Sequence, residues 1–187
     1  MRITGGKARS IPLRAPKGDF VRPATDALRQ AVFSSIGPID GCVVLDLFAG
    51  SGAYGLEALS RGAATAHFVE QHAGARRCIE ANLQAVLKSA GIESSAGKID
   101  AQEVMSWLNR DTRSWDIIIA DPPYDWLRDQ GERLLDLLPE RLNPGGTLIL
   151  EAPGDYQPPP LTRLSAPHQS KAKPHQPCFW RWQKQAD

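Results

Sequence analysis

The fold is decided by the stretch Val43-Val44-Leu45-Asp46-Leu47-Phe48-Ala49-Gly50-Ser51-Gly52-Ala53-Tyr54-Gly55. Its apolar run is short, β-branched at its start and closed by turn residues, which is typical of a buried parallel strand. Gly50 and Gly52 permit a tight turn that a ligand can approach closely. The helix expected from about residue 52 directs its free N–H groups at the same place. We therefore predict a ligand site at the carboxyl end of this strand, where open α/β sheets bind their ligands.

The rest of the chain alternates between strand-like and helix-like segments. Short apolar runs predict strands at residues 42–47, 64–69, 94–99, 115–120 and 147–150. Apolar residues at helical spacing predict helices at residues 25–36, 52–61, 73–90, 101–109 and 127–141. Strands and helices that alternate in this way predict an α/β fold with a doubly wound, mostly parallel sheet.

The two ends of the chain depart from this alternation. The Gly5-Gly6 pair lies between short polar and apolar stretches and predicts a β-hairpin. We expect a basic N-terminal extension over residues 1–22 and a main domain over residues 23–187. Near the C-terminus, an aromatic run suits a last strand. We predict that residues 161–164 and 178–182 complete the sheet as a hairpin.

The composition is that of an ordinary globular protein, with 42% hydrophobic and 23% charged residues among 187. No apolar run reaches the roughly 18 residues of a membrane span, and the N-terminus lacks the apolar core of a signal peptide. The three cysteines, Cys42, Cys78 and Cys178, are odd in number and widely spaced. They predict reduced thiols in a cytoplasmic protein that holds no metal.

The formal net charge of +1 conceals an uneven distribution. Residues 1–35 carry a net charge of +5, residues 36–155 a net charge of −8, and residues 156–187 a net charge of +4. This pattern has two interpretations. The basic ends are either a chance clustering of solvated side chains or two surfaces that approach a polyanion such as nucleic acid.

The glycines of the opening stretch match the pattern G-x-G-x-x-G, and Glu70 ends the next predicted strand. That pair alone fits a dinucleotide site. However, Asp46 places a carboxylate at the mouth of the loop, where it would repel a pyrophosphate. It suits a ligand with a cationic end, such as the amino-acid portion of S-adenosylmethionine, and Glu70 can accept hydrogen bonds from ribose hydroxyls. A glycine-rich turn without a ligand is the structural alternative.

The second motif is Asp121-Pro122-Pro123-Tyr124, directly after the fourth predicted strand. In a doubly wound sheet this strand lies beside the first, so both motifs face one crevice. An exocyclic amine on a base is a poor nucleophile, because its lone pair is delocalised into the ring. The Asp121 carboxylate and the Pro122 carbonyl can accept its two hydrogens, and Tyr124 offers a face for base stacking. The alternative is a turn whose prolines only end a strand.

Asp100 ends the third predicted strand and is followed by Ala101. In this topology the position reaches the adenine of a bound cofactor, and Asp100 could accept from its amino group. A helix N-cap is an equally good interpretation, and both can hold at once. The four histidines form no grouping with a serine or cysteine that would indicate nucleophilic catalysis.

The two motifs together resemble the class I S-adenosylmethionine-dependent amino-methyltransferases. The chain is more closely similar to the bacterial family that methylates N2 of a guanine in small-subunit (16S) ribosomal RNA. The similarity rests on Arg2-Ile3-Thr4-Gly5-Gly6-Lys7-Ala8-Arg9, Arg22-Pro23-Ala24-Thr25-Asp26-Ala27-Leu28-Arg29, the opening stretch continued through Gly55-Leu56-Glu57-Ala58-Leu59-Ser60-Arg61-Gly62-Ala63, and the Asp-Pro-Pro-Tyr turn.

This resemblance implies a seven-stranded class I methyltransferase (Rossmann-like) sheet with an N-terminal basic hairpin. It implies catalytic roles for Asp121, Pro122, Pro123 and Tyr124. The implied cofactor-binding residues are Asp46, Phe48, Ala49, Gly50, Gly52, Glu70, Asp100, Ala101 and Thr25. The implied RNA-binding residues are Arg2, Lys7, Arg9 and Arg22.

The chain departs from the family pattern in three places. It reads Glu70-Gln71-His72 where an acid usually follows two residues after the ribose-binding glutamate. It reads Arg9-Ser10-Ile11 where the family has Arg-Gly-Arg, and its C-terminal segment matches loosely. These departures bear on the placement of the substrate more than on cofactor binding.

The expected function is methyl transfer from S-adenosylmethionine to guanine N2 of 16S ribosomal RNA, within a small-subunit assembly particle, by a monomer. Three alternatives remain open. A DNA adenine-N6 or cytosine-N4 methyltransferase shares the turn, but 187 residues leave no room for a target-recognition domain. A non-catalytic RNA-binding assembly module would not bind S-adenosylmethionine, and an oxidoreductase would prefer NAD.

Overall fold

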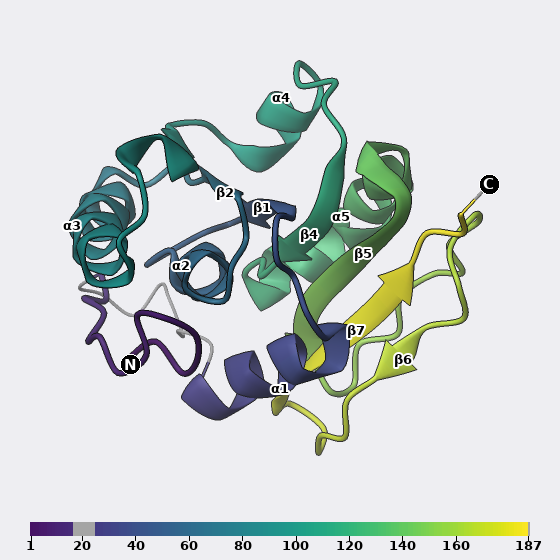
Figure 1. The fold of residues 1–187 in the computed structure, drawn as a ribbon. Coiled ribbons are helices and arrows are strands. Elements are labelled where there is room, and N and C mark those ends of the chain that lie inside the picture. The colour runs from purple at the N-terminus through teal and green to yellow at the C-terminus, as the bar shows by residue number, and fades with distance from the viewer. Residues whose placement is uncertain (17–24, 187) are drawn as a thin grey trace.

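The computed structural model describes residues 1–16 and 25–186 (Figure 1). The strands are β1 (Val43–Leu47), β2 (Thr65–Val69), β3 (Gly97–Asp100), β4 (Trp115–Ala120), β5 (Leu142–Pro153), β6 (His168–Gln169) and β7 (Pro177–Gln183). The α-helices are α1 (Asp26–Ile36), α2 (Ala53–Ser60), α3 (Ala73–Ala90), α4 (Val104–Leu108) and α5 (Tyr124–Leu137). Two short 3₁₀ helices are η1 (Ser94–Ala96) and η2 (Leu138–Arg141).

The seven strands form one sheet in the order β3-β2-β1-β4-β5-β7-β6. Strands β1 to β5 pair in parallel, whereas β7 runs antiparallel to both β5 and β6. The order reverses direction between β1 and β4, which is where an open α/β sheet forms its ligand crevice. The prediction of a doubly wound, mostly parallel seven-stranded sheet is confirmed.

Alternate residues of the central strands bury opposite faces of the sheet, as strand geometry requires. Leu45 and Ile118 pack with α4 and α5 in one cluster. Val44 and Ile117 pack on the other face with α1 and α2. A further cluster holds Phe68 of β2 against α2 and α3. The strands therefore read as nearly continuous apolar runs, because both faces are covered.

The N-terminal residues fold back on themselves through one antiparallel bridge, Arg2 to Pro12, and no named strand forms among residues 1–16. The predicted hairpin is thus reduced to a loop with a single bridge. Its apolar side chains, Ile3, Ala8 and Leu13, are buried in the α2–α3 cluster. The proposed division at residue 22 falls in 17–24, outside the described residues, so it stays a prediction.

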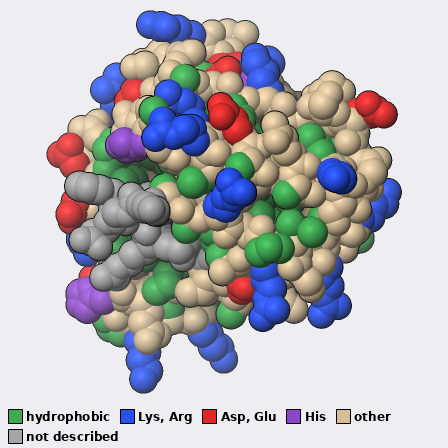
Figure 2. Space-filling model, turned by 90° about the vertical axis from the view of Figure 1, so that its left-hand side faces the viewer, with side chains coloured by type: hydrophobic (Ala, Val, Ile, Leu, Met, Phe, Trp, Pro, Cys, Tyr) green, Lys and Arg blue, Asp and Glu red, His purple; other side chains and the backbone are tan. Residues whose placement is uncertain are grey.

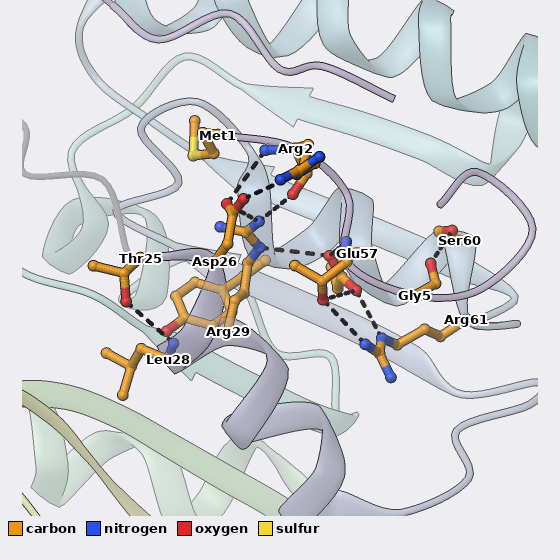
Figure 3. Close-up of polar contacts among 12 residues, drawn as sticks. Met1, Arg2, Gly5, Thr25, Asp26, Leu28, Arg29, Glu57, Ser60 and Arg61 are labelled. Atoms are coloured by element: carbon orange, nitrogen blue, oxygen red, sulfur yellow. Dashed lines mark hydrogen bonds and ion pairs between the residues drawn. The ribbon is translucent and has the colours of Figure 1, made fainter. Parts of the chain in front are cut away.

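A polar network fastens this loop to α1 and α2 (Figure 3). The fully buried Glu57 carboxylate accepts hydrogen bonds from the Thr4 backbone N–H at 2.8 Å and the Thr4 hydroxyl at 2.7 Å. It also pairs with Arg61 at 2.8 Å and with the buried Arg29 at 3.5 Å. Arg29 in turn pairs with Asp26 at 2.9 Å. Because these charges are paired and hydrogen-bonded, their burial is tolerated.

The C-terminal hairpin differs in one arm from its prediction. The aromatic run forms β7 as expected, and its partner is His168–Gln169. Residues 161–164 contribute only an isolated bridge from Leu164 to Lys184. No helix in the described part of the chain has the length and hydropathy needed to cross a membrane.

Candidate active site

A cavity of about 650 Å³ opens at the carboxyl ends of β1, β2, β4 and β5. Both sequence motifs reach its wall. From the first motif and the following strand come Asp46, Phe48, Ala49, Gly50 and Glu70, and from the second come Asp121, Pro122, Pro123 and Tyr124. Its volume is typical of a site for a small molecule or cofactor. The predicted ligand loop and the predicted base-holding turn therefore face one space.

Strand register places three carboxylates on one face of the sheet. Asp46 of β1 pairs with Ile119 of β4, and Asp121 follows Ile119 by two residues. Ala120 pairs with Leu150 of β5, so the next residues, Asp121 and Glu151, are neighbours. Residues two apart on a strand share a face, which brings Asp46, Asp121 and Glu151 together at the cavity wall.

The cofactor half of the cavity is built around Asp46, which is only 1% exposed. One of its oxygens accepts a hydrogen bond from the Gly55 N–H at 2.8 Å, which ties the end of β1 to the first turn of α2. Burial, and then the nearby Glu70 charge, raise the pKa of Asp46 to about 8. A cationic ligand group beside Asp46 would favour its ionised form.

Glu70 at the end of β2 closes the other side of this half. Its two oxygens accept hydrogen bonds from the Gly50 N–H at 2.9 Å and from the His72 N–H at 2.7 Å. Oε1 also lies 2.9 Å from His72 Nδ1, so the second lone pair of Oε2 is the one that can accept from a ribose hydroxyl. Gly52 has φ of +78° and packs against Phe68 and Ile79, which explains the glycine there. The donor and acceptor set fits S-adenosylmethionine.

The acceptor half is the turn between β4 and α5. The Asp121 N–H donates to the Leu47 carbonyl at 3.3 Å, which holds the turn against the end of β1. Pro123 precedes α5 in an extended conformation, and Tyr124 begins that helix. Burial, and then the charges of Glu151 and Asp46, raise the pKa of Asp121 well above its usual value.

An aromatic pair spans the two halves. Phe48 adopts φ of +58° in the loop after β1, and its ring meets Trp126 of α5 edge-on, with ring centroids 4.7 Å apart. Both side chains line the cavity together with Tyr124. Three aromatic side chains thus line the cavity, where they offer faces for stacking a planar base.

Asp100 and Ala101 are placed differently from the other predicted cofactor residues. One Asp100 oxygen accepts from the Trp107 indole N–H at 2.6 Å and lies 2.8 Å from His67 Nε2. The neighbouring cavity wall is formed by Gln102, Glu103 and Val104. Glu103, rather than Asp100, caps α4 by accepting from the Met105 and Ser106 N–H groups. The adenine contact of Asp100 stays a prediction.

Thr25 and three of the predicted RNA-binding residues, Arg2, Lys7 and Arg9, are not part of the cavity wall. The Thr25 hydroxyl caps α1 by accepting from the Leu28 N–H at 3.1 Å. Arg2, Lys7 and Arg9 are exposed on the N-terminal loop, although Arg2 also pairs with Asp26 at 3.7 Å. Arg22 lies outside the described residues. Figure 2 shows Lys and Arg side chains spread over the face that this loop shares with α3.

The structure adds two residues that the sequence did not single out as site residues. Glu151 lies two residues before the end of β5. Its Oε2 atom accepts a 2.7 Å hydrogen bond from the hydroxyl of Tyr54 in α2. Both side chains line the cavity and are 3% exposed. One signal was available for Glu151: it follows the fifth apolar run just as Asp121 follows the fourth. Among the described residues, no group of three or more His, Cys, Asp and Glu side chains is arranged to hold a metal ion.

Comparison with known proteins identifies a family model and several proteins that are similar to this chain. Residues 1–178 match the family model described as conserved hypothetical protein 95. Ribosomal RNA small subunit methyltransferase D of Escherichia coli K12 is 35% identical over 125 residues, or 66% of this chain and 60% of that protein's length. The Haemophilus influenzae protein of the same name is 29% identical over 160 residues, covering 83% of this chain and 80% of the relative.

A solved structure shows that the similarity extends through the whole fold. The Escherichia coli protein yhhF is 30% identical, with a TM-score of 0.82 over 100% of this chain and 99% of that one. The family match spans the opening stretch, the Asp-Pro-Pro-Tyr turn and the start of β7. The resemblance found in the sequence is confirmed: the chain belongs to the conserved hypothetical protein 95 family, which includes ribosomal RNA small subunit methyltransferase D.

Proposed function

We propose that this protein transfers a methyl group from S-adenosylmethionine to the N2 amine of a guanine in 16S ribosomal RNA. The observation that carries the proposal is that the Asp46–Gly52 loop and the Asp-Pro-Pro-Tyr turn line one cavity. A glycine-rich loop alone would fit several nucleotides, and the turn alone could simply end a strand. The relatives, which are named ribosomal RNA small subunit methyltransferases, support the methylation of ribosomal RNA.

Each half of the cavity has its own task. Asp46 and Glu70 bind and orient the cofactor, whose sulfonium supplies the electrophilic methyl group. The Asp121 carboxylate and the Pro122 carbonyl accept the two amine hydrogens and direct the nitrogen lone pair at that methyl group. Transfer of the methyl group from that sulfonium to the amine nitrogen would leave the amine with one excess proton, which Asp121 or water would take. Positioning supplies most of the rate enhancement.

The raised pKa of Asp121 suits this role. Burial favours its neutral form in the free protein, whereas a donor-rich amine that enters the cavity favours the carboxylate. Lys7 and Arg9 would approach phosphates from the N-terminal loop, outside the cavity. We expect a monomer that acts in the cytoplasm on a small-subunit assembly particle.

Two measurements test this function. The first is a calorimetric titration of the protein with S-adenosylmethionine and, separately, with NAD. The second is incubation of the protein with labelled cofactor and small-subunit particles from cells that lack it, followed by mass mapping of the labelled nucleotide. We expect binding of S-adenosylmethionine alone and label on N2 of one guanine.

Other outcomes would redirect the proposal. Label found only in DNA would indicate an adenine-N6 or cytosine-N4 methyltransferase. Failure to bind S-adenosylmethionine would favour a non-catalytic assembly module. Preferential binding of NAD would point to an oxidoreductase.

A further inference from the structure

We propose that Glu151 selects guanine as the acceptor base by accepting the hydrogen on its ring nitrogen N1, beside the amine held by Asp121. This inference rests on the proposed function and assigns a role to a side chain outside both sequence motifs. The substrate class that it specifies is a purine whose reactive amine lies next to a ring N–H.

The sheet places Glu151 in the right position. Glu151 follows Leu150 within β5, and Leu150 pairs with Ala120, so Glu151 and Asp121 lie at the same level of the sheet. Neighbouring strands are about 4.8 Å apart, so the two side chains, one from each strand end, can converge and each bring an oxygen to a neighbouring donor on one edge of a base. Both carboxylates line the cavity, and Glu151 is 3% exposed.

Tyr54 determines which oxygen of Glu151 remains for a ligand. Its hydroxyl donates to Oε2 at 2.7 Å, and its ring packs near Phe33, with centroids 6.5 Å apart. Burial, and then the Glu151 charge, raise the pKa of Tyr54, so the hydroxyl keeps its proton and remains a donor. Within residues 1–16 and 25–186, Oε1 of Glu151 receives no hydrogen bond. Because Glu151 lines the cavity, this second oxygen is available to accept a hydrogen bond from a ligand.

The chemistry of the bases gives this oxygen a discriminating role. Guanine presents two neighbouring donors on its Watson–Crick edge, N1–H and the N2 amine, and two neighbouring carboxylates accept both. Adenine and cytosine place a ring nitrogen lone pair beside their amine, and that lone pair would face the Glu151 oxygen. A site whose buried polar groups are left unpaired by the wrong substrate discriminates strongly against it. Enzymes that act on an extruded base read the same edge.

The test uses 2-aminopurine, which keeps an amine at C2 but has a bare lone pair at N1. Small-subunit RNA is prepared with guanosine or 2-aminopurine riboside at the position that mass mapping identifies. Wild-type protein should prefer guanine by at least about 100-fold in kcat/KM. Glu151→Gln keeps the acceptor for Tyr54 and turns an N–H donor toward N1. The preference should fall by at least about 10-fold, with guanine losing rate, while the cofactor Kd stays within about twofold.

Two further variants keep the test decisive. Tyr54→Phe frees the carboxylate and keeps the ring, so it should reduce the preference without changing the cofactor Kd, even if Glu151→Gln fails to fold. Glu80→Gln, on the exposed surface of α3, is the matched control and should leave the preference unchanged. An unchanged preference in both Glu151→Gln and Tyr54→Phe would overturn the inference. Absence of guanine methylation by the wild-type protein would overturn the proposed function as well.

Discussion

The two halves of the cavity are held together in different ways. In the cofactor half, the carboxylate of Asp46 accepts a hydrogen bond from a backbone N–H of α2, and that of Glu70 accepts from backbone N–H groups of the loops after β1 and β2. In the acceptor half, Asp121 is anchored through its backbone N–H, and its carboxylate lies near those of Glu151 and Asp46. The first half is fixed by hydrogen bonds that the fold itself requires. The second brings together carboxylates whose charge is unfavourable until a substrate arrives.

This difference has a consequence for mutations. Removing a carboxylate from the cofactor half leaves buried N–H donors unsatisfied, so stability and cofactor binding should fall together. Removing the Asp121 carboxylate from the acceptor half relieves repulsion between like charges, so activity should fall while stability holds or rises. Stability and function are coupled in one half and opposed in the other.

The largest effect is expected for Asp121→Ala. Methyl transfer should fall by about 10²- to 10³-fold, the range measured when one preorganised polar group is removed from an active site. Cofactor affinity should change by no more than a few fold, and the free energy of unfolding at pH 8 should equal or exceed that of the wild type. Single-turnover kinetics, calorimetry and urea unfolding measure the three quantities.

Asp136→Ala, on the exposed face of α5, is the matched control for this variant. It should match the wild type in all three measurements. Retained methyl transfer in Asp121→Ala would remove that residue from the mechanism. A clear loss of stability would contradict the proposed contrast between the two halves.

Glu70→Ala should show the opposite combination. The buried Gly50 N–H would lose its acceptor, which costs about 1–3 kcal/mol, whereas the His72 N–H, on an exposed residue, would lose less. Cofactor affinity should fall by at least about 10-fold, because the loop around Gly50 loses its anchor and the ribose loses its acceptor. Urea unfolding and calorimetry would reveal both losses. If Glu70→Ala lowered cofactor affinity but was as stable as the exposed-site variant Glu80→Ala, the hydrogen bonds that Glu70 accepts would not stabilise the fold.

The pH dependence of stability offers a third comparison. Burial raises the pKa of Asp46 to about 8 and that of Glu151 to about 7, in each case above the value of an unfolded chain near 4. The folded state therefore holds these protons more tightly. Their stabilising contribution is complete below about pH 4 and is lost as the pH rises through 7 and 8.

The free energy of unfolding of the ligand-free protein should consequently decline between about pH 5 and pH 8. The double variant Asp46→Asn, Glu151→Gln should show a shallower decline in urea unfolding across that range. Saturating S-adenosylmethionine should also reduce the decline, because its cationic end favours ionised Asp46. Parallel curves for the wild type and the double variant would show that other groups dominate the titration.

The sequence predicted much of this architecture because its strongest signals are local. Apolar strands, amphipathic helices and the two motifs at strand ends need no tertiary information. The position of Glu151 after the fifth apolar run is visible in the sequence, but its place beside Asp121 depends on the register between β4 and β5, which shifts between Trp115 and Ile117. The carboxylate of Asp100 turns to Trp107 and His67, a tertiary interaction that no spacing along the chain reveals.

The N-terminal loop differed from its prediction for a similar reason. A Gly-Gly pair between short alternating stretches favours a hairpin by itself. Here Gly6, with φ of +76°, lies so close to the Ser60 carbonyl that a Cβ would be 1.9 Å from that oxygen. The Lys7 N–H donates to the same carbonyl at 2.7 Å. The backbone of the loop therefore hydrogen-bonds to the end of α2 instead of forming the β-ladder of a hairpin.

The smallest effect is expected outside both halves, on the exposed side chains of this docked loop. Lys7→Ala combined with Arg9→Ala should weaken RNA binding only a few fold at physiological salt. The slope of log affinity against log salt concentration should decrease in magnitude by about 0.7–0.9 for each phosphate that the loop no longer neutralises. Cofactor affinity should not change, because neither residue lines the cavity.

Filter binding of small-subunit RNA at several salt concentrations measures this slope, with Arg128→Ala on α5 as the matched control. Arg128 is 52% exposed and faces Asp125 and Asp155, so its charge is offset and its removal should leave the slope unchanged. Arg2 should contribute less than Lys7 or Arg9, since it pairs with Asp26. An unchanged slope in the double variant would mean that the positive charge of this loop serves solubility rather than RNA binding. The acceptor base would then have to be delivered by side chains nearer the cavity.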